Sequence, residues 1–452
     1  MINDFDKIEK QVLKKITPSP KERKEIEEIV TQLTKDVEQE IKKYKLNLSI
    51  ELVGSIAKGT YIKNNTDIDL FILFPPSVSR PQLQQTGLSI GRTILKNQEE
   101  CFAEHPYIRG TYKGIITEIV PCYKIESAKQ KLSAVDRTPL HTKYVRQHLL
   151  ESQKKDVLLF KQFLRGIGCY GAEAEIEGFS GYLCEILIIK YSTFRTLIND
   201  AQNWCYGHKI TLHKRKTPDF KTPIVFIDPV DIKRNVSSAV SEEKFNVFLK
   251  ASREYIKKPR ITFFFPNKIK PWDVKKIKKK LQEKQVIAVK INKPSIISEN
   301  LFPQVRKAVR SINELCERYD FNIIDYRFFI NEEEIFMILF PKNHRISKTK
   351  IHMGPPVEMK KNADDFLNRW TNDKRTVKNP FEKKGRLYVK IKREYTEIDN
   401  LLKDQVENLS LGKHIDKYVK KKYVLLKKDD LLIEKLRVFW TEYLDKKMSW
   451  ER

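Results

Sequence analysis

The sequence is poor in glycine, in paired cysteines and in long apolar runs. Its six cysteines include no C-x-x-C pair, which argues against a zinc site and against a disulfide framework. Free thiols in a reducing cytoplasm are the simplest interpretation. No apolar stretch reaches the roughly 18 residues of a membrane span. The charged N-terminus, MINDFDKIEKQVLKK, lacks the apolar segment of a secretory signal.

Acidic residues are also few relative to basic ones. The chain has 59 Asp and Glu against 87 Lys and Arg, which gives a formal net charge of +28. Such an excess favours a polyanionic partner, above all nucleic acid, although a generally lysine-rich surface is the alternative. Of 15 glycines, 12 precede residue 208. Because glycine lets a backbone approach a ligand closely, the N-terminal half is predicted to handle the ligand.

Length and hydrophobic periodicity predict several domains with both helices and strands. Helices are expected at 20–46, 80–102, 144–165, 180–204, 303–319, 394–407 and 430–447. Strands are expected at 48–53, 67–74, within 108–125, and at 261–265, 285–291, 335–340 and 386–393. The polar stretch 341–385 is expected to be rich in loops.

The stretch GSIAKGTYIKNNTDIDLFILFP, residues 54–75, carries the strongest chemical signal. Asp67 and Asp69 are two positions apart on a predicted strand, so their carboxylates point the same way. Like charges this close repel each other unless a cation lies between them. Carboxylate oxygens suit Mg²⁺, and two such ions can hold both the attacking and the leaving oxygen in phosphoryl transfer. Gly54 and Ser55 form a turn whose backbone N–H groups can face a phosphate.

A third carboxylate is expected from a neighbouring strand, and Glu118 in GIITEIVPCYKI is the candidate. A lone acidic residue in a strand is more often solvent-facing, and a lone D-x-D is a weak signal. The combination is more specific, because a Gly-Ser turn, an apolar strand carrying D-I-D and a later acidic strand occur in order.

The combined pattern resembles the nucleotidyltransferase superfamily whose fold is shared by DNA polymerase beta. More narrowly, the chain resembles the archaeal, class I CCA-adding enzymes, which are tRNA nucleotidyltransferases. Further words in family order carry this resemblance: EHPYIRGTYKG (104–114), EIVPCYKI (118–125), DRTPLHTKYV (136–145), FLRGIGCYGAE (163–173), GFSGYLCEILIIKY (178–191), FIDPVDIKRNV (226–236) and HMGPPVE (352–358). The family's third carboxylate is often Asp, so Glu118 departs from the pattern while keeping the charge.

The resemblance implies a role for each of these motifs. Asp67, Asp69 and Glu118 would hold Mg²⁺ and the nucleoside triphosphate, and Glu118 would help to deprotonate the RNA 3′ hydroxyl. Nucleotide-binding residues would be Gly54, Ser55, Lys58, His141, Lys161, Tyr170 and Arg234. His105 is a possible nucleotide contact, with a packed structural histidine as an equal alternative. For Lys161 the alternative is a solvated lysine.

Arg234 matches the arginine with which the family selects the incoming base. A guanidinium presents only donors. Cytosine and adenine offer acceptors where guanine and uracil place an N–H, so an arginine admits C and A and rejects G and U. Asp228 and Asp231 are expected to orient Arg234; the alternative is an ordinary surface Asp–Arg pair.

Lysine clusters and interleaved aromatics in the C-terminal half are expected to follow RNA phosphates. Duplex RNA is recognised by its shape and backbone, which suits a tRNA acceptor arm. The predicted RNA-binding residues are Lys278, Lys421, His352, Gly354 and Pro355, the last three from the word that the family places near the tRNA elbow. For each lysine run a solvated helix face is the alternative.

The resemblance implies an α+β multidomain fold with a polymerase-beta-like nucleotidyltransferase head at 1–140 and a helical neck at 141–215. An α/β body would comprise 216–257 and 380–452, and an α/β tail 258–379. The implied reaction is template-independent addition of C, C and A to tRNA from CTP and ATP. We expect a cytoplasmic homodimer that uses Mg²⁺, contacts the acceptor and T arms and binds no membrane.

Two other functions are open. Poly(A) or another terminal synthesis on RNA would use the same carboxylates, but an enzyme restricted to ATP needs no cytosine-competent Arg234. A non-catalytic RNA-binding protein with a vestigial head has no reason to keep three clustered acidic positions.

Overall fold

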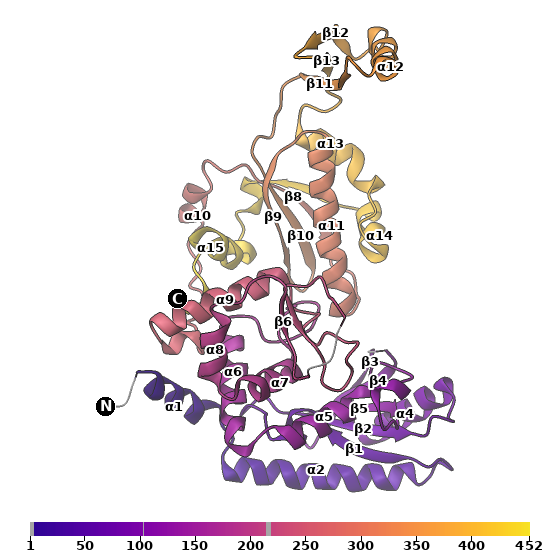
Figure 1. The fold of residues 1–452 in the computed structure, drawn as a ribbon, viewed down its shortest axis with the longest axis vertical. Coiled ribbons are helices and arrows are strands. Elements are labelled where there is room, and N and C mark those ends of the chain that lie inside the picture. Colours follow the sequence, from indigo (N-terminus) through magenta and orange to yellow (C-terminus); the bar gives the residue numbers. More distant parts are fainter. Residues whose placement is uncertain (1–3, 103, 214–217) are drawn as a thin grey trace. The chain divides into compact units, whose positions relative to one another are not determined.

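The computed structural model describes residues 4–102, 104–213 and 218–452, which form two compact units (Figure 1). Unit 1 comprises Met1–Lys268 with Lys447–Arg452, and unit 2 comprises Ile269–Lys446. Helices and sheets occur in both units, which confirms the predicted α+β multidomain class; the five-stranded sheet of unit 1 is mixed, and the two sheets of unit 2 are antiparallel. Within the described residues, no helix has the length and apolar character needed to cross a membrane.

Unit 1 opens with a five-stranded sheet in the order β1–β2–β5–β4–β3. The strands are β1 (Ser49–Val53), β2 (Asp67–Phe74), β3 (Lys96–Phe102), β4 (Pro106–Tyr112) and β5 (Ile115–Tyr123). Only β2 and β5 pair in parallel, and the other pairs are antiparallel.

Helices α2 (Pro20–Ile41) and α4 (Arg80–Ile94) pack on one face of this sheet (Figure 1). Ile68, Leu70 and Ile72 of β2 all lie in the core that these helices cover. Because side chains alternate along a strand, Asp67 and Asp69 lie on the opposite face. Helices α2 and α4 therefore do not cover the face of β2 that carries Asp67 and Asp69.

The rest of unit 1 is mainly helical. Its helices are α1 (Asp4–Ile16), α3 (Gly54–Lys58), α5 (Arg137–His148), α6 (Lys154–Gly166), α7 (Gly181–Tyr191), α8 (Phe194–Ala201) and α9 (Glu242–Lys257). A short parallel pair joins β6 (His208–Ile210) to β7 (Ile224–Phe226). Helix α7 begins where the Ser180 side chain accepts a hydrogen bond from the Leu183 backbone N–H, a regular N-cap. Buried aromatics, Phe160, Phe163 and Phe248 among them, fill the shared core.

Unit 2 contains a four-stranded sheet, β14–β8–β10–β9, with helices on both faces. These strands are β8 (Ile287–Asn292), β9 (Ile323–Ile330), β10 (Glu334–Pro341) and β14 (Val424–Lys427). One face packs on α11 (Ser298–Arg318), α13 (Ile398–Gln405) and α14 (Lys413–Lys421), the other on α10 (Val274–Lys280) and α15 (Arg437–Asp445). A second sheet, of β11 (Thr349–Pro356), β13 (Arg386–Lys392) and β12 (Thr376–Lys383), carries α12 (Lys360–Thr371).

Some predicted elements are wrong in type or extent. The helix expected at 80–102 ends at Ile94, because 96–102 pairs with β4 as strand β3. The helices expected at 144–165 and 180–204 are each broken in two, the second at Ser192, whose φ is +69°. Residues 261–263 form a 3₁₀ turn instead of a strand, and 341–385 is not mostly loop but contains β11, α12 and β12. In each case tertiary pairing or a local backbone turn overrides the hydrophobic pattern.

Candidate active site

Two of the predicted carboxylates face each other across parallel strands. Asp69 on β2 is the register partner of Glu118 on β5, and Asp67 precedes Asp69 on the same face. Burial, with the charge of Asp67, raises the pKa of Asp69 to about 6. Burial, with the charge of Asp69, raises the pKa of Glu118 to about 7. Carboxyl groups that repel each other in this way form a site where a bound cation is favoured.

Gly54 is the position that makes room for Asp69. It follows β1, whose last residue, Val53, is the register partner of Asp69. Its φ is +71°, and a Cβ there would lie 1.8 Å from Asp69 Oδ2. Any other residue would therefore clash with the carboxylate as well as strain the backbone. Ser55 is the next residue of the short helix α3 and is partly buried.

Arg109 borders the acidic pair on the other side. It is the register partner of Glu118 on the antiparallel strand β4, and its Nε lies 3.8 Å from Glu118 Oε1. Asp69, Glu118 and the Arg109 side chain therefore lie side by side on the neighbouring strands β2, β5 and β4. Arg109 was not among the predicted site residues.

The donor set fits a hard divalent cation that keeps open coordination positions. Within the described part of the chain, no group of three or more His, Cys, Asp or Glu side chains is arranged as a ready-made metal cage. Mg²⁺ does not require one, because it is commonly bound by one or two carboxylates together with waters and substrate phosphates. Asp69, whose carboxylate fills the space that Gly54 leaves, and Glu118 opposite it are a pair of that kind.

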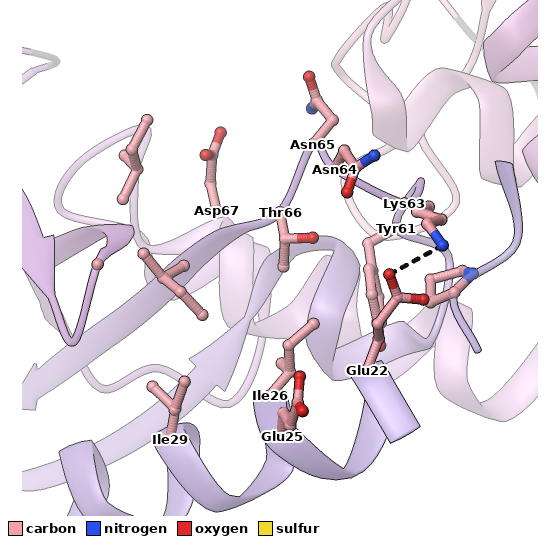
Figure 2. Close-up of a pocket in the computed structure, with 14 residues that line it drawn as sticks. Glu22, Glu25, Ile26, Ile29, Tyr61, Lys63, Asn64, Asn65, Thr66 and Asp67 are labelled. Atoms are coloured by element: carbon pink, nitrogen blue, oxygen red, sulfur yellow. Dashed lines mark ion pairs between the residues drawn. The ribbon is translucent and has the colours of Figure 1, made fainter. Parts of the chain in front are cut away.

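A cavity of about 530 Å³ lies beside Asp67, between α2 and the segment that leads into β2 (Figure 2). Lys63 Nζ in that segment lies 3.0 Å from Glu22 Oε1 on α2. Glu22 also completes a capping box with Ser19. This ion pair connects the segment that precedes Asp67 to the first turn of α2.

Lys58 and Lys161, both predicted nucleotide contacts, meet at one buried carboxylate. Glu185 on α7 is fully buried; its Oε2 lies 2.6 Å from Lys58 Nζ and its Oε1 3.1 Å from Lys161 Nζ. Thr60 donates its hydroxyl to Glu185 Oε1 at 2.6 Å. Burial would raise the pKa of Glu185, but the two ammonium groups lower it to about 2. Lys161 is only 2% exposed, so the alternative of a solvated lysine is wrong.

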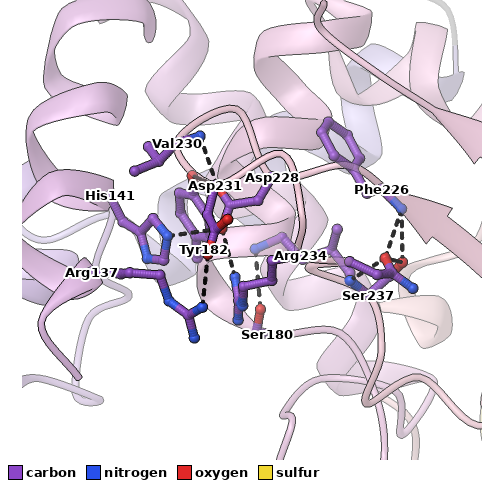
Figure 3. A network of polar contacts seen from close by, with 12 residues as sticks. Arg137, His141, Ser180, Tyr182, Phe226, Asp228, Val230, Asp231, Arg234 and Ser237 are labelled. Carbon is purple, nitrogen blue, oxygen red and sulfur yellow. Dashed lines mark hydrogen bonds and ion pairs between the residues drawn. The ribbon is translucent and has the colours of Figure 1, made fainter. Parts of the chain in front are cut away.

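Arg234 and His141 converge on another buried carboxylate, that of Asp228 (Figure 3). Asp228 Oδ2 lies 2.9 Å from Arg234 Nη1 and 3.0 Å from His141 Nε2. Tyr182 donates to Asp228 Oδ1 at 3.2 Å and stacks on His141 with 4.1 Å between ring centroids. Burial would raise the pKa of Asp228, but the His141 hydrogen bond and the Arg234 charge bring it well below its usual range.

The predicted role of Asp231 is wrong in part. Its carboxylate lies 2.6 Å from Lys131 Nζ and 3.1 Å from Arg137 Nη1. Among the described residues it is Asp228, and not Asp231, whose carboxylate holds the Arg234 guanidinium (Figure 3). Its backbone carbonyl accepts from the Arg234 N–H at 2.8 Å. Asp231 thus shapes the turn while Asp228 orients the side chain.

Two further predicted contacts, His105 and Tyr170, lie in different surroundings. His105 is 2% exposed, and among the described residues neither ring nitrogen has a hydrogen-bond partner. Burial lowers its pKa, which favours the neutral ring. The Arg165 guanidinium lies 4.8 Å from the Tyr170 ring centroid. A Cβ at Gly181 would lie 3.2 Å from the Tyr170 hydroxyl and 3.7 Å from Lys161 Nζ, so these groups meet at the start of α7.

The predicted RNA-binding residues lie in unit 2. Lys278 Nζ is 3.4 Å from Asp429 Oδ1, and Lys421 is exposed in the last turn of α14. His352 on β11 packs on Phe366 and Trp370, with ring centroids 5.9 and 5.1 Å apart.

Gly354 and Pro355 follow His352 on β11. A Cβ at Gly354 would lie 2.7 Å from the Phe366 ring, so this glycine permits the aromatic packing. The register with β13 shifts between Met353 and Pro356, across Gly354 and Pro355. The glycine and proline of HMGPPVE therefore have a structural role in β11, in addition to the predicted role of this motif in RNA binding.

A cavity of about 320 Å³ beside His352 is rich in cations. Its lining includes Arg318, Lys350, Arg369, Arg375, Lys392, Arg393 and the Trp370 ring. Arg369 and Arg375 lie over Trp370, with guanidinium-to-centroid distances of 5.4 and 5.1 Å. Cations beside an aromatic face suit a phosphate with a stacked base.

Sequence reasoning missed Glu185, Thr60 and Tyr182 as well as Arg109. A signal for Glu185 is present in the sequence, because it is the single acidic residue of the largely apolar helix GYLCEILIIKY. Thr60 and Tyr182 carry no such signal, since their partners come from segments distant in sequence.

The fold and the paired carboxylates of unit 1 define a nucleotidyltransferase. Residues 30–141 match the nucleotidyltransferase domain family, 155–265 the second domain of tRNA nucleotidyltransferases and 282–428 the C-terminal domain of the CCA-adding enzyme. The chain belongs to the family of CCA-adding enzymes.

Relatives similar over most of their length support the assignment. The CCA-adding enzyme of Methanosarcina mazei is 34% identical over 93% of both chains. That of Methanocaldococcus jannaschii is 34% identical over 91% of this chain and 94% of its own. That of Archaeoglobus fulgidus is 33% identical over 88% and 91%.

Proposed function

We propose that this protein adds C, C and A to the 3′ end of tRNA, using CTP and ATP without a template. The register pairing of Asp69 with Glu118 carries the proposal, because it supplies the carboxylate face that nucleotidyl transfer needs. Family membership supports tRNA as the acceptor, as does the net charge of +28.

The reaction joins the 3′ oxygen of the RNA to the α-phosphorus of the nucleotide. The bond from that phosphorus to the β-phosphate oxygen breaks, and pyrophosphate leaves with the electron pair. Glu118 would take the hydroxyl proton, because it is the carboxylate opposite Asp69 and its burial beside that charge raises its pKa. Asp67 and Asp69 hold the other side of the reacting centre.

A divalent cation is part of this proposal. Mg²⁺ held by Asp67, Asp69 and Glu118 would neutralise phosphate charge and lower the pKa of the attacking hydroxyl. The extra methylene of Glu118, compared with Asp, moves its carboxylate further from the strand. Lys58, whose charge acts on Asp69, would balance the remaining negative charge of the triphosphate.

Base selection would rest on Arg234. Its guanidinium carries five N–H groups, of which Asp228 takes one at 2.9 Å. The remaining donors suit an acceptor edge of cytosine or adenine and oppose the N–H of guanine or uracil. His141, held by the same carboxylate, would keep Asp228 ionised and in place.

Unit 2 would hold the tRNA through the acceptor and T arms. The cations beside Trp370 and His352, with Lys278 and Lys421, are proposed phosphate contacts. The head, neck, body and tail division, the homodimer and the cytoplasmic location also remain predictions. Light scattering of the purified protein would test the dimer.

Incorporation by the purified protein, with Mg²⁺ and a tRNA lacking its 3′ CCA, tests the function. Each nucleotide is supplied singly, and then CTP is supplied with ATP. Two additions with CTP alone and a third only with ATP is the expected result. Long ATP tails formed without CTP would instead indicate poly(A) synthesis. No incorporation by a protein that binds tRNA would overturn the proposal.

A further inference from the structure

Glu185 is a charged group that the proposed chemistry does not use directly. It lies in the middle of α7 with no solvent exposure, among the apolar side chains of Leu183, Ile186 and Leu187. A buried carboxylate is costly unless its oxygens are hydrogen-bonded and its charge is balanced. The residues that balance it are two lysines from different parts of unit 1.

The two lysines differ in how many hydrogen-bond acceptors surround each ammonium group. Lys161 Nζ has three acceptors: Glu185 Oε1 at 3.1 Å, the Thr60 carbonyl at 3.1 Å and the Thr60 hydroxyl at 3.3 Å. These match the three N–H groups of an ammonium. Among the described residues, Lys58 Nζ has one hydrogen-bond acceptor, Glu185 Oε2 at 2.6 Å. Two of its N–H groups therefore have no acceptor in the described part of the chain, and 8% of the side chain is exposed.

Lys58 also lies where a ligand is expected. It is the last residue of α3, whose first residue, Gly54, is packed against Asp69. Its positive charge acts on the Asp69 carboxylate. The buried cluster contains two ammonium groups and one carboxylate, so one unit of positive charge remains beside the acidic face of the sheet. Lys58 therefore offers a polyanion a positive charge beside carboxylates that would otherwise repel it.

We propose that Glu185 is a positioning residue for the triphosphate: from inside the protein it holds Lys58 at the edge of the carboxylate site, with two ammonium hydrogens directed to the phosphates. Lys161 and Thr60 fix Glu185 from the other side, so the position of Lys58 is set by α6 and α7 as well as by its own short helix. This inference rests on the proposed function, because it assigns the phosphate subsite of that same reaction.

Glu185→Gln tests the proposal, because the amide keeps the shape and removes the charge. We expect the KM for CTP and for ATP to rise by about tenfold or more, the cost of losing one charge-assisted contact. The two KM values should rise by the same factor, because the phosphates are common to both nucleotides. Glu185→Asp should recover part of the loss and also serves if the glutamine variant does not fold.

A double-mutant cycle with Lys58→Met separates positioning from a structural role. If Glu185 acts through Lys58, the double variant should have a KM close to that of Lys58→Met alone. Glu9→Gln is the matched control, because Glu9 forms an ion pair with Arg195 elsewhere in unit 1, and its KM values should not change. Independent addition of the two effects would overturn the proposal. So would a variant whose KM is unchanged and whose kcat falls only with its folded fraction.

The affinity for inorganic triphosphate can be measured by calorimetry without RNA. This measurement tests the phosphate subsite independently of the proposed function, because no nucleotide is added. Weaker binding to Glu185→Gln than to the unmodified protein supports the phosphate subsite whatever RNA is extended. Equal binding would overturn it even if the unmodified protein adds C, C and A.

Discussion

Asp69 and Glu118 are register partners on β2 and β5, and β2–β5 is the one parallel pair in the five-stranded sheet. The parallel pairing brings a carboxylate from residue 69 beside one from residue 118. Among the described residues, the ion pair at these two carboxylates is that of Glu118 with Arg109, whose Nε is 3.8 Å from Glu118 Oε1. The consequence is a site in which burial and mutual repulsion raise the pKa values of both carboxyl groups and favour a bound cation.

Asp69→Asn should reduce nucleotide addition by about a thousandfold or more, because several kcal/mol of charge stabilisation in the transition state are lost. The affinity for tRNA should stay within about twofold, since phosphate contacts elsewhere supply it. Single-turnover addition and filter binding measure the two quantities. Asp219→Asn, at an exposed position, is the control. Equal loss of both quantities would show that Asp69 is needed for folding instead.

The raised pKa values predict how pH and Mg²⁺ act on stability. Asp69 with a pKa of about 6 and Glu118 with about 7 bind protons more tightly in the folded than in the unfolded protein. Their contribution to the free energy of unfolding therefore falls as pH rises from about 4 to about 7. Mg²⁺, which binds the ionised forms, should raise Tm more at pH 8 than at pH 5.5, and Asp69→Asn should abolish the difference. A Tm shift of the same size at both pH values would contradict this linkage.

Arg234→Gln should relax the choice of base. A glutamine amide presents both a donor and an acceptor, so the N–H of guanine or uracil is no longer opposed by donors alone. We expect addition of G and U relative to C to rise by about tenfold, with a higher KM for CTP and ATP. Arg234→Lys keeps the charge beside Asp228 and serves as the comparison. Unchanged selectivity in both variants would remove Arg234 from base recognition.

Arg375→Gln should weaken tRNA binding without changing the choice of nucleotide. If its guanidinium neutralises one phosphate, the slope of log K against log salt should decrease by about 0.7–0.9. Fluorescence titration of tRNA at several salt concentrations measures this slope. Lys21→Gln, at a lysine whose side chain is 88% exposed on α2, is the matched loss of one positive charge. Equal slopes for both variants would place Arg375 outside the RNA interface.

The sequence was a good guide wherever a local pattern carried the information. The apolar run that follows Asp69 predicted the strand at 67–74, and the two-residue period of a strand predicted the common face of Asp67 and Asp69. It was a poor guide at 96–102, where a polar segment becomes an edge strand only through β4. The role of Asp231 was likewise misread, since its partner Lys131 is 100 residues away.

The sequence by itself determined the α+β class, the D-I-D strand and the positions of the glycines and charges on which the site depends. Tertiary structure alone decided that Glu118 is the register partner of Asp69, that Asp228 holds His141 as well as Arg234, and that Glu185 links Lys58 to Lys161. The physical reason is that a buried charge needs a partner at about 3 Å, and such partners come from segments that only folding brings together.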